Sequence, residues 1–144
     1  MAGRICLWRY REHSRTHPGF HLSADPPGAA QLLTLLGSLA KARTPQIANV
    51  VLDPVTPAVL AIPNDRSGHA AISAYRHWEL VVDPRFPPER LHFAVMNDRV
   101  RTELSVVQVE SVVAGVEDIR ALRGDYAIGD ENEDQLWFWW QEGV

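Results

Sequence analysis

The chain has 144 residues, the usual size of one domain, and a domain of this length buries roughly 68% of the surface that its unfolded chain exposes. Its composition, 46% hydrophobic and 22% charged, is that of an ordinary globular domain and excludes a disordered chain. The net charge of −4 argues against a nucleic-acid partner, and the lack of a long uncharged apolar stretch argues against a membrane span. We therefore expect a soluble cytoplasmic protein.

Residues 4–11 alternate loosely and are rich in β-forming side chains, with Cys6, Trp8 and Tyr10 on one face, which predicts a strand. Arginines interrupt its apolar residues, so this segment is not the core of a secretion signal. Cys6 is the one cysteine, which favours a reducing compartment and a packed thiol over a catalytic nucleophile. A second short strand is predicted over Phe20–Ser23.

The clearest element of the sequence is a helix over residues 26–42. Asp25 suits the N-cap and Pro26 the first helical position, because proline has no N–H to leave unpaired there. Thr44-Pro45 ends the helix, since the residue before a proline avoids the helical region. The apolar residues follow helical spacing: Ala29, Leu32, Leu33, Leu36 and Ala40.

The middle of the chain predicts strands. Two short β-rich runs, Ile47–Leu52 and Ala58–Ile62, are bounded by prolines, as edge strands often are. His77–Asp83 alternates between apolar and polar residues. Leu91–Val107 carries two alternating runs around Asn97-Asp98, which predicts a β-hairpin.

The last third predicts a helix and a strand. Valines and isoleucine at helical spacing indicate a helix at about 110–122, with Gly124 as its C-terminal cap, and Gln135–Gln141 reads as a strand. Strands outnumber helices and the short reversal is a hairpin. We therefore expect a single α+β domain with a mostly antiparallel sheet of five to seven strands and two helices packed on one face.

Metal and cofactor motifs are incomplete. His13, His17 and His21 have the spacing of a helical ligand row, but Pro18-Gly19 interrupts it. The acidic run 130–134 begins like a calcium loop and then lacks the glycine and glutamate that such a loop needs. We therefore predict no bound metal and no cofactor.

Two further motifs are also ruled out. Residues 124–129 hold two glycines at phosphate-loop spacing, but without the lysine and hydroxyl side chain that contact phosphate and magnesium, so they are predicted to form a turn. No serine lies in a Gly-x-Ser-x-Gly frame, so there is no nucleophile elbow.

The run Trp137-Phe138-Trp139-Trp140 is the most unusual feature. In a strand these aromatic side chains point alternately to both faces, so both faces need apolar cover. One explanation is an interior strand covered by helices on one face and by a loop on the other. The other is a patch that binds a protein, since tryptophan is enriched at the centres of interfaces. The predicted binding residues are Trp137, Trp139, Trp140, Asp125, Tyr126 and Glu133.

Two functions of different classes follow. The first is a protein–protein interaction module with the physical character of immunity or antitoxin proteins, which uses the aromatic strand and the acidic loop. The alternative is a small enzyme whose site is assembled from scattered side chains such as His13, His17, Asp125 and Glu133. The sequence also leaves homo-oligomerisation open.

Overall fold

A computed structural model describes residues 3–11, 19–56, 59, 71–123, 125–129 and 135–140. Two helices are present in this part of the chain, α1 (Pro26–Ala40) and α3 (Val106–Arg120). The strands are β1 (Ile5–Tyr10), β2 (Phe20–Ala24), β3 (Gln46–Val51), β4 (Ile72–Ala74), β5 (His77–Val82), β6 (Leu91–Met96), β7 (Arg99–Leu104), β8 (Asp125–Ile128) and β9 (Leu136–Trp140).

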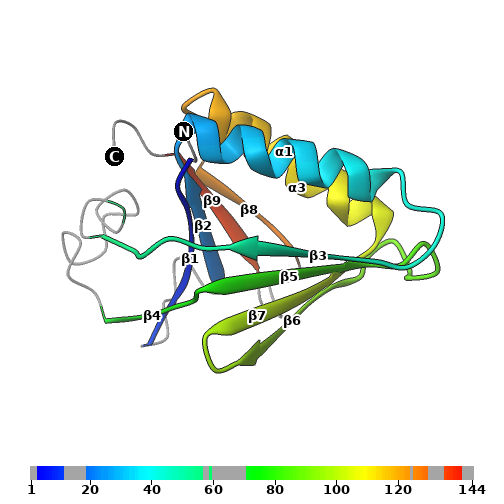
Figure 1. Cartoon of the computed structure of the whole chain (residues 1–144), viewed down its shortest axis with the longest axis horizontal. Coiled ribbons are helices and arrows are strands. Elements are labelled where there is room, and N and C mark those ends of the chain that lie inside the picture. The colour runs from blue at the N-terminus through cyan, green and yellow to red at the C-terminus, as the bar shows by residue number, and fades with distance from the viewer. Residues whose placement is uncertain are drawn as a thin grey trace.

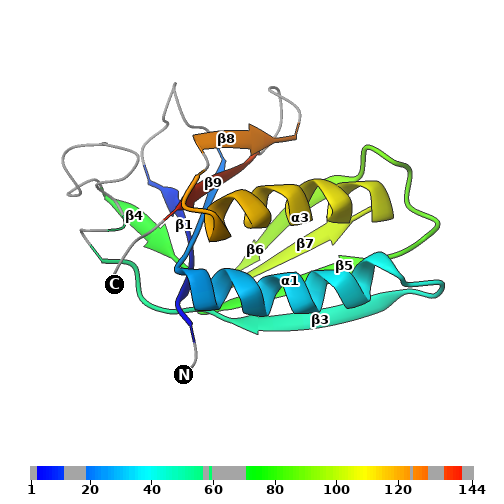
Figure 2. The same cartoon turned by 90° about the horizontal axis from the view of Figure 1, so that it is seen from above.

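The strands form two sheets. One has five strands in the order β4-β1-β2-β9-β8, and the other has four in the order β3-β5-β7-β6. Figure 1 shows the two sheets running in different directions, with both helices above them, and Figure 2 shows α1 and α3 side by side. The α+β class, the two helices and the mostly antiparallel pairing confirm the sequence prediction.

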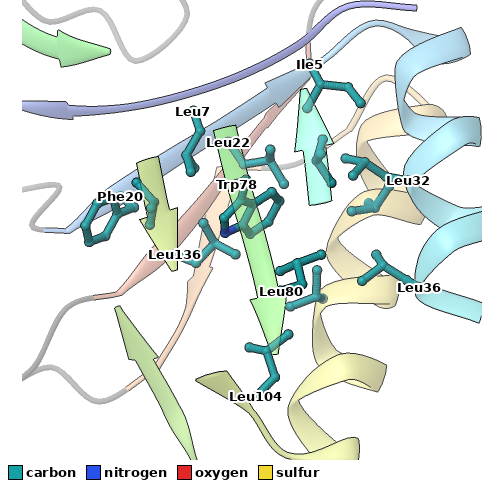
Figure 3. Close-up of a cluster of buried hydrophobic side chains, with 14 of the residues drawn as sticks. Ile5, Leu7, Phe20, Leu22, Leu32, Leu36, Trp78, Leu80, Leu104 and Leu136 are labelled. Carbon is teal, nitrogen blue, oxygen red and sulfur yellow. The ribbon is translucent and has the colours of Figure 1, made fainter. Parts of the chain in front are cut away.

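The main core lies where the helices meet one face of both sheets. Leu32 and Leu36 of α1 face Trp78 and Leu80 of β5, and all four are fully or almost fully buried (Figure 3). The indole Nε1–H of Trp78 donates to Oγ1 of Thr102 at 2.8 Å, so the polar atom of this large side chain is paired inside the core. Both sheets and both helices thus share one apolar core.

The prediction of one sheet with five to seven strands is wrong, because the described strands form two sheets, of five and four strands. β2 pairs in parallel with β9, and β5 pairs in parallel with β7, so both sheets are mixed. Each parallel pairing joins strands that are not consecutive, and periodicity within a strand carries no information about such a partner. The segment predicted to be a turn at 124–129 includes the edge strand β8, and the short β4 was not predicted at all. The predicted strand Ala58–Ile62 lies almost wholly outside the described residues.

The local end signals are mostly confirmed. The Asp25 carboxylate accepts from the Gly28 N–H at 2.8 Å and caps α1. Asn97, at φ 58°, provides the reversal between β6 and β7. The predicted Gly124 cap is wrong. The left-handed residue after α3 is Leu122, also at φ 58°, and the Arg123 N–H returns to the Asp118 carbonyl at 2.7 Å. This is a Schellman motif with leucine where glycine is usual.

Candidate interaction surface around β9

Strand β9 separates two apolar clusters. Leu136 and Phe138 point into the main core and are fully buried. Trp137 and Trp139 point to the opposite face of the five-stranded sheet, where they join a second cluster with Cys6 and Trp8 of β1. The alternation predicted for β9 is therefore present, and both of its faces are covered by apolar side chains.

Loop residues cover part of this second cluster. Val55, Val59 and Ile72, which come from the connection between β3 and β4 and from β4 itself, pack against it. Of the two explanations for the aromatic run, the interior strand therefore accounts for the two side chains that are described as buried, Phe138 and Trp139. Trp139 is 5% exposed, whereas Trp137 remains partly exposed at the rim.

Neighbouring strands place a row of side chains across this face. The register pairs Trp8 with His21, His21 with Trp137, and Trp137 with Ala127 of the edge strand β8. His21 stacks on Trp8 with a centroid separation of 5.3 Å and on Trp137 at 6.5 Å. Because Ala127 carries only a methyl group, the ring of Trp137 has large neighbours toward β2 and a small one toward β8.

A buried hydrogen bond fixes the geometry of the cluster. Trp139 Nε1–H donates to His21 Nδ1 at 2.9 Å, and His21 is fully buried. Nδ1 is the acceptor here, so the proton of the neutral imidazole is on Nε2. Trp137 and Trp139 stack with a centroid separation of 5.9 Å and an interplanar angle of 7°. The partly exposed indole is therefore held on a rigid aromatic support.

Cys6 belongs to the same cluster and is buried. Its thiol donates to the Pro54 carbonyl at 3.5 Å. Burial raises the pKa of the Cys6 thiol to about 11, with the nearby Arg4 opposing this effect. The thiolate is almost absent at neutral pH, which fits the sequence interpretation of Cys6 as a packed residue.

The other predicted site residues are only partly placed. Asp125 and Tyr126 lie on β8, where their backbone positions pair with Trp139 and Phe138. Trp140 is the last residue of β9 and pairs with Ala24. Glu133, His13 and His17 lie outside the described residues, as does the whole acidic run 130–134, so the enzyme alternative remains a prediction.

A separate pocket of about 630 Å³ lies where the two sheets diverge. Its polar lining consists of Asp53, Arg76, His77 and Asp98, and apolar residues such as Val55 form the rest. Within the described ranges, no group of three or more His, Cys, Asp or Glu side chains could hold a metal ion. No described helix is long and apolar enough to cross a membrane.

Comparison with known proteins gives no family: no protein-family model, curated protein or solved structure matches the chain.

Sequence reasoning identified the aromatic run but not the side chains that surround it. Trp8 and His21 were assigned to strands, yet nothing local indicates that β2 lies between β1 and β9. One pattern in the sequence could have indicated them. The first strand carries Cys6, Trp8 and Tyr10 on one face, and these large apolar side chains require other apolar side chains to pack against.

Proposed function

We propose that the chain is a protein–protein interaction module, of the kind represented by immunity and antitoxin proteins, whose contact surface is centred on Trp137. The observation that carries the proposal is the partly exposed indole of Trp137, which stacks on the buried Trp139 and His21. A rigid aromatic side chain loses little conformational entropy on binding, which is why such residues often dominate interface energies.

Charge suggests the chemistry of the partner. The connector between β8 and β9 carries the acidic run 130–134, directly before the strand that holds Trp137. A complementary surface would therefore be basic around an apolar centre, since complementary potentials speed association and disfavour wrong partners.

The test uses the tagged full chain as bait in an extract of its source cells, with bound proteins quantified by mass spectrometry. Trp137→Ala is expected to lower recovery of a specific partner by at least about tenfold, as loss of a hot-spot side chain does. Ala127→Arg, which adds a bulky cation beside the same indole, is expected to lower it as well.

The matched control is Val107→Ala, because Val107 is an exposed apolar residue on α3, away from β9. All three variants are expected to keep a thermal midpoint close to that of the wild type. A partner that binds all three variants equally well would show that the Trp137 surface is not the contact site.

A further inference from the structure

Strand β3 is an unprotected edge of the four-stranded sheet. Among the described strands it pairs with β5 alone, so no described strand covers its other side. Its sequence, Gln-Ile-Ala-Asn-Val-Val, contains no charged residue, proline or glycine, although edges are usually protected by such residues. Ile47 and Val51 are 60% and 74% exposed.

Backbone hydrogen bonds show which groups face the open side. The Leu52 N–H donates toward the β5 side, to the Arg76 carbonyl at 2.8 Å. The next N–H, that of Asp53, donates in the opposite direction, to the Ile5 carbonyl at 2.7 Å. Since direction alternates along a strand, the N–H and C=O groups of Ile47, Asn49 and Val51 point to the open edge.

Space is also present beside this edge. A pocket of about 370 Å³ lies between β3 and α1, lined on the helix side by Gln31 and Leu35 and on the strand side by Asn49 and Val51. This hollow leaves room between β3 and α1 for side chains of an approaching strand.

We infer that this edge binds β3 of a second copy of the chain, antiparallel, around a two-fold axis at Asn49. Asn49 then lies opposite Asn49 of the second copy, and Ile47 lies opposite its Val51. Each of these pairs exchanges both N–H···O bonds, and exposed apolar side chains face one another across the junction. A two-fold interface requires such self-complementarity.

Other registers leave bonds unmade. A shift in one direction brings Pro45, which has no N–H, opposite one of the three edge residues. A shift in the other direction brings Asp53 opposite, and its N–H already bonds Ile5. The register centred on Asn49 is the one in which Ile47, Asn49 and Val51 all find free counterparts.

Charge at the two ends of β3 favours the same arrangement. Lys41 and Arg43 precede the strand, whereas Asp53 follows it. The carboxylates of Asp53 and Asp25 accept from the N–H groups of Ile5 and Arg4, so both carboxylates lie at the start of β1. Antiparallel pairing brings the basic end of one copy toward the net acidic end of the other, while the strands themselves carry no charge to repel each other.

Sedimentation equilibrium of the whole chain, from about 1 µM to about 1 mM, tests the inference. The wild type is expected to dimerise, and Ile47→Lys to weaken the dimer by at least about tenfold, because it places a lysine in the edge pairing of both copies. Met96→Lys is the matched control, since Met96 is 53% exposed on the opposite edge strand, β6. It is expected to leave the dimer within about twofold of the wild type.

A cross-linking experiment tests the register. With a short bifunctional thiol reagent, Asn49→Cys is expected to yield covalent dimer, because residues 49 face each other. Ile47→Cys is expected not to, because the two copies of residue 47 are four residues apart along the strands, or about 14 Å. The buried Cys6 does not compete. A monomeric wild type, equal effects of the two lysine variants, or equal cross-linking at 47 and 49 would overturn the inference.

Discussion

Gly115 of α3 contacts the ring of Phe138 so closely that adding one methyl group tests how β9 is placed against the helices. A Cβ built on Gly115 would lie 2.5, 2.6 and 2.7 Å from Cε1, Cδ1 and Cζ of Phe138. Carbon atoms in contact normally lie about 3.5–4.0 Å apart. Phe138 is fully buried, so its ring has little room to move away.

Two opposing effects decide the outcome of Gly115→Ala. Alanine is favoured over glycine in a helix interior by about 0.8–1.0 kcal/mol. Overpacking a buried site costs about 1–3 kcal/mol, and distances this short place Gly115 in the upper part of that range. We expect a net loss of about 1–2 kcal/mol in the free energy of unfolding, equivalent to a fall of about 2–8 °C in the thermal midpoint.

Gly37→Ala is the matched control, because Gly37 lies in α1 and a Cβ there would meet nothing within 4 Å. It is expected to gain about 0.5–1 kcal/mol from helix propensity alone. In a Phe138→Leu background, Gly115→Ala should become nearly neutral or stabilising, which gives a coupling energy of about 1–3 kcal/mol.

The assay is urea unfolding followed by tryptophan fluorescence, with all variants at one protein concentration because self-association would shift the midpoint. If Gly115→Ala stabilises the wild type as Gly37→Ala does, β9 does not pack against α3 as described, and the reasoning fails.

Further outcomes are expected at three residues. Thr102→Val leaves the Trp78 indole N–H buried without an acceptor and should lower the free energy of unfolding by about 1–3 kcal/mol, whereas Thr102→Ser should retain most of the stability; a small effect of Thr102→Val in urea unfolding would contradict the bond. Leu122→Gly should raise the thermal midpoint, because the left-handed backbone conformation of Leu122 costs about 1 kcal/mol and glycine adopts it without this cost. A lower midpoint would mean that contacts of the leucine side chain stabilise the fold by more than the backbone conformation destabilises it. Cys6 should resist thiol reagents at pH 8 until the protein is denatured, because its pKa of about 11 leaves about 0.1% thiolate. Rapid modification of the native protein at pH 8 would contradict the burial of this thiol. Because the pKa of Cys6 is higher in the folded than in the unfolded chain, the free energy of unfolding should also fall as pH rises from about 9 toward 11, where the unfolded thiol ionises first.

Local signals in the sequence were sufficient for elements whose ends depend on neighbouring residues. Asp25 and Pro26 correctly predicted the start of α1, and Asn97-Asp98 correctly predicted the turn between β6 and β7. Caps and tight turns can be predicted in this way because they depend on side chains only a few positions away. The Leu122 cap was missed since leucine is disfavoured in the left-handed region, and only its hydrogen bonds reveal the motif.

The pairing of strands that are distant in the sequence could not be predicted. The requirement that β9 be covered on both faces followed from its alternating aromatic residues, whereas the identity of the cover did not. Trp137 and Trp139 meet His21 because β2 and β9 are adjacent, and no spacing within either strand encodes that adjacency. The sequence therefore indicated Trp137 and Trp139, but not the side chains of β1 and β2 that they contact.

The parallel pairing of β2 with β9 also has a consequence for the order of folding. The Trp139–His21 hydrogen bond joins residues 118 positions apart, and Phe138 completes the core that α1 and α3 cover. During synthesis, β1 and β2 leave the ribosome well before β9 and must wait with one edge of β2 unpaired. Contacts of such long range form slowly, because the loop between them must close first. The nascent chain thus exposes an apolar strand edge for most of its synthesis, a period in which a chaperone or a second nascent chain can compete with β9 for it.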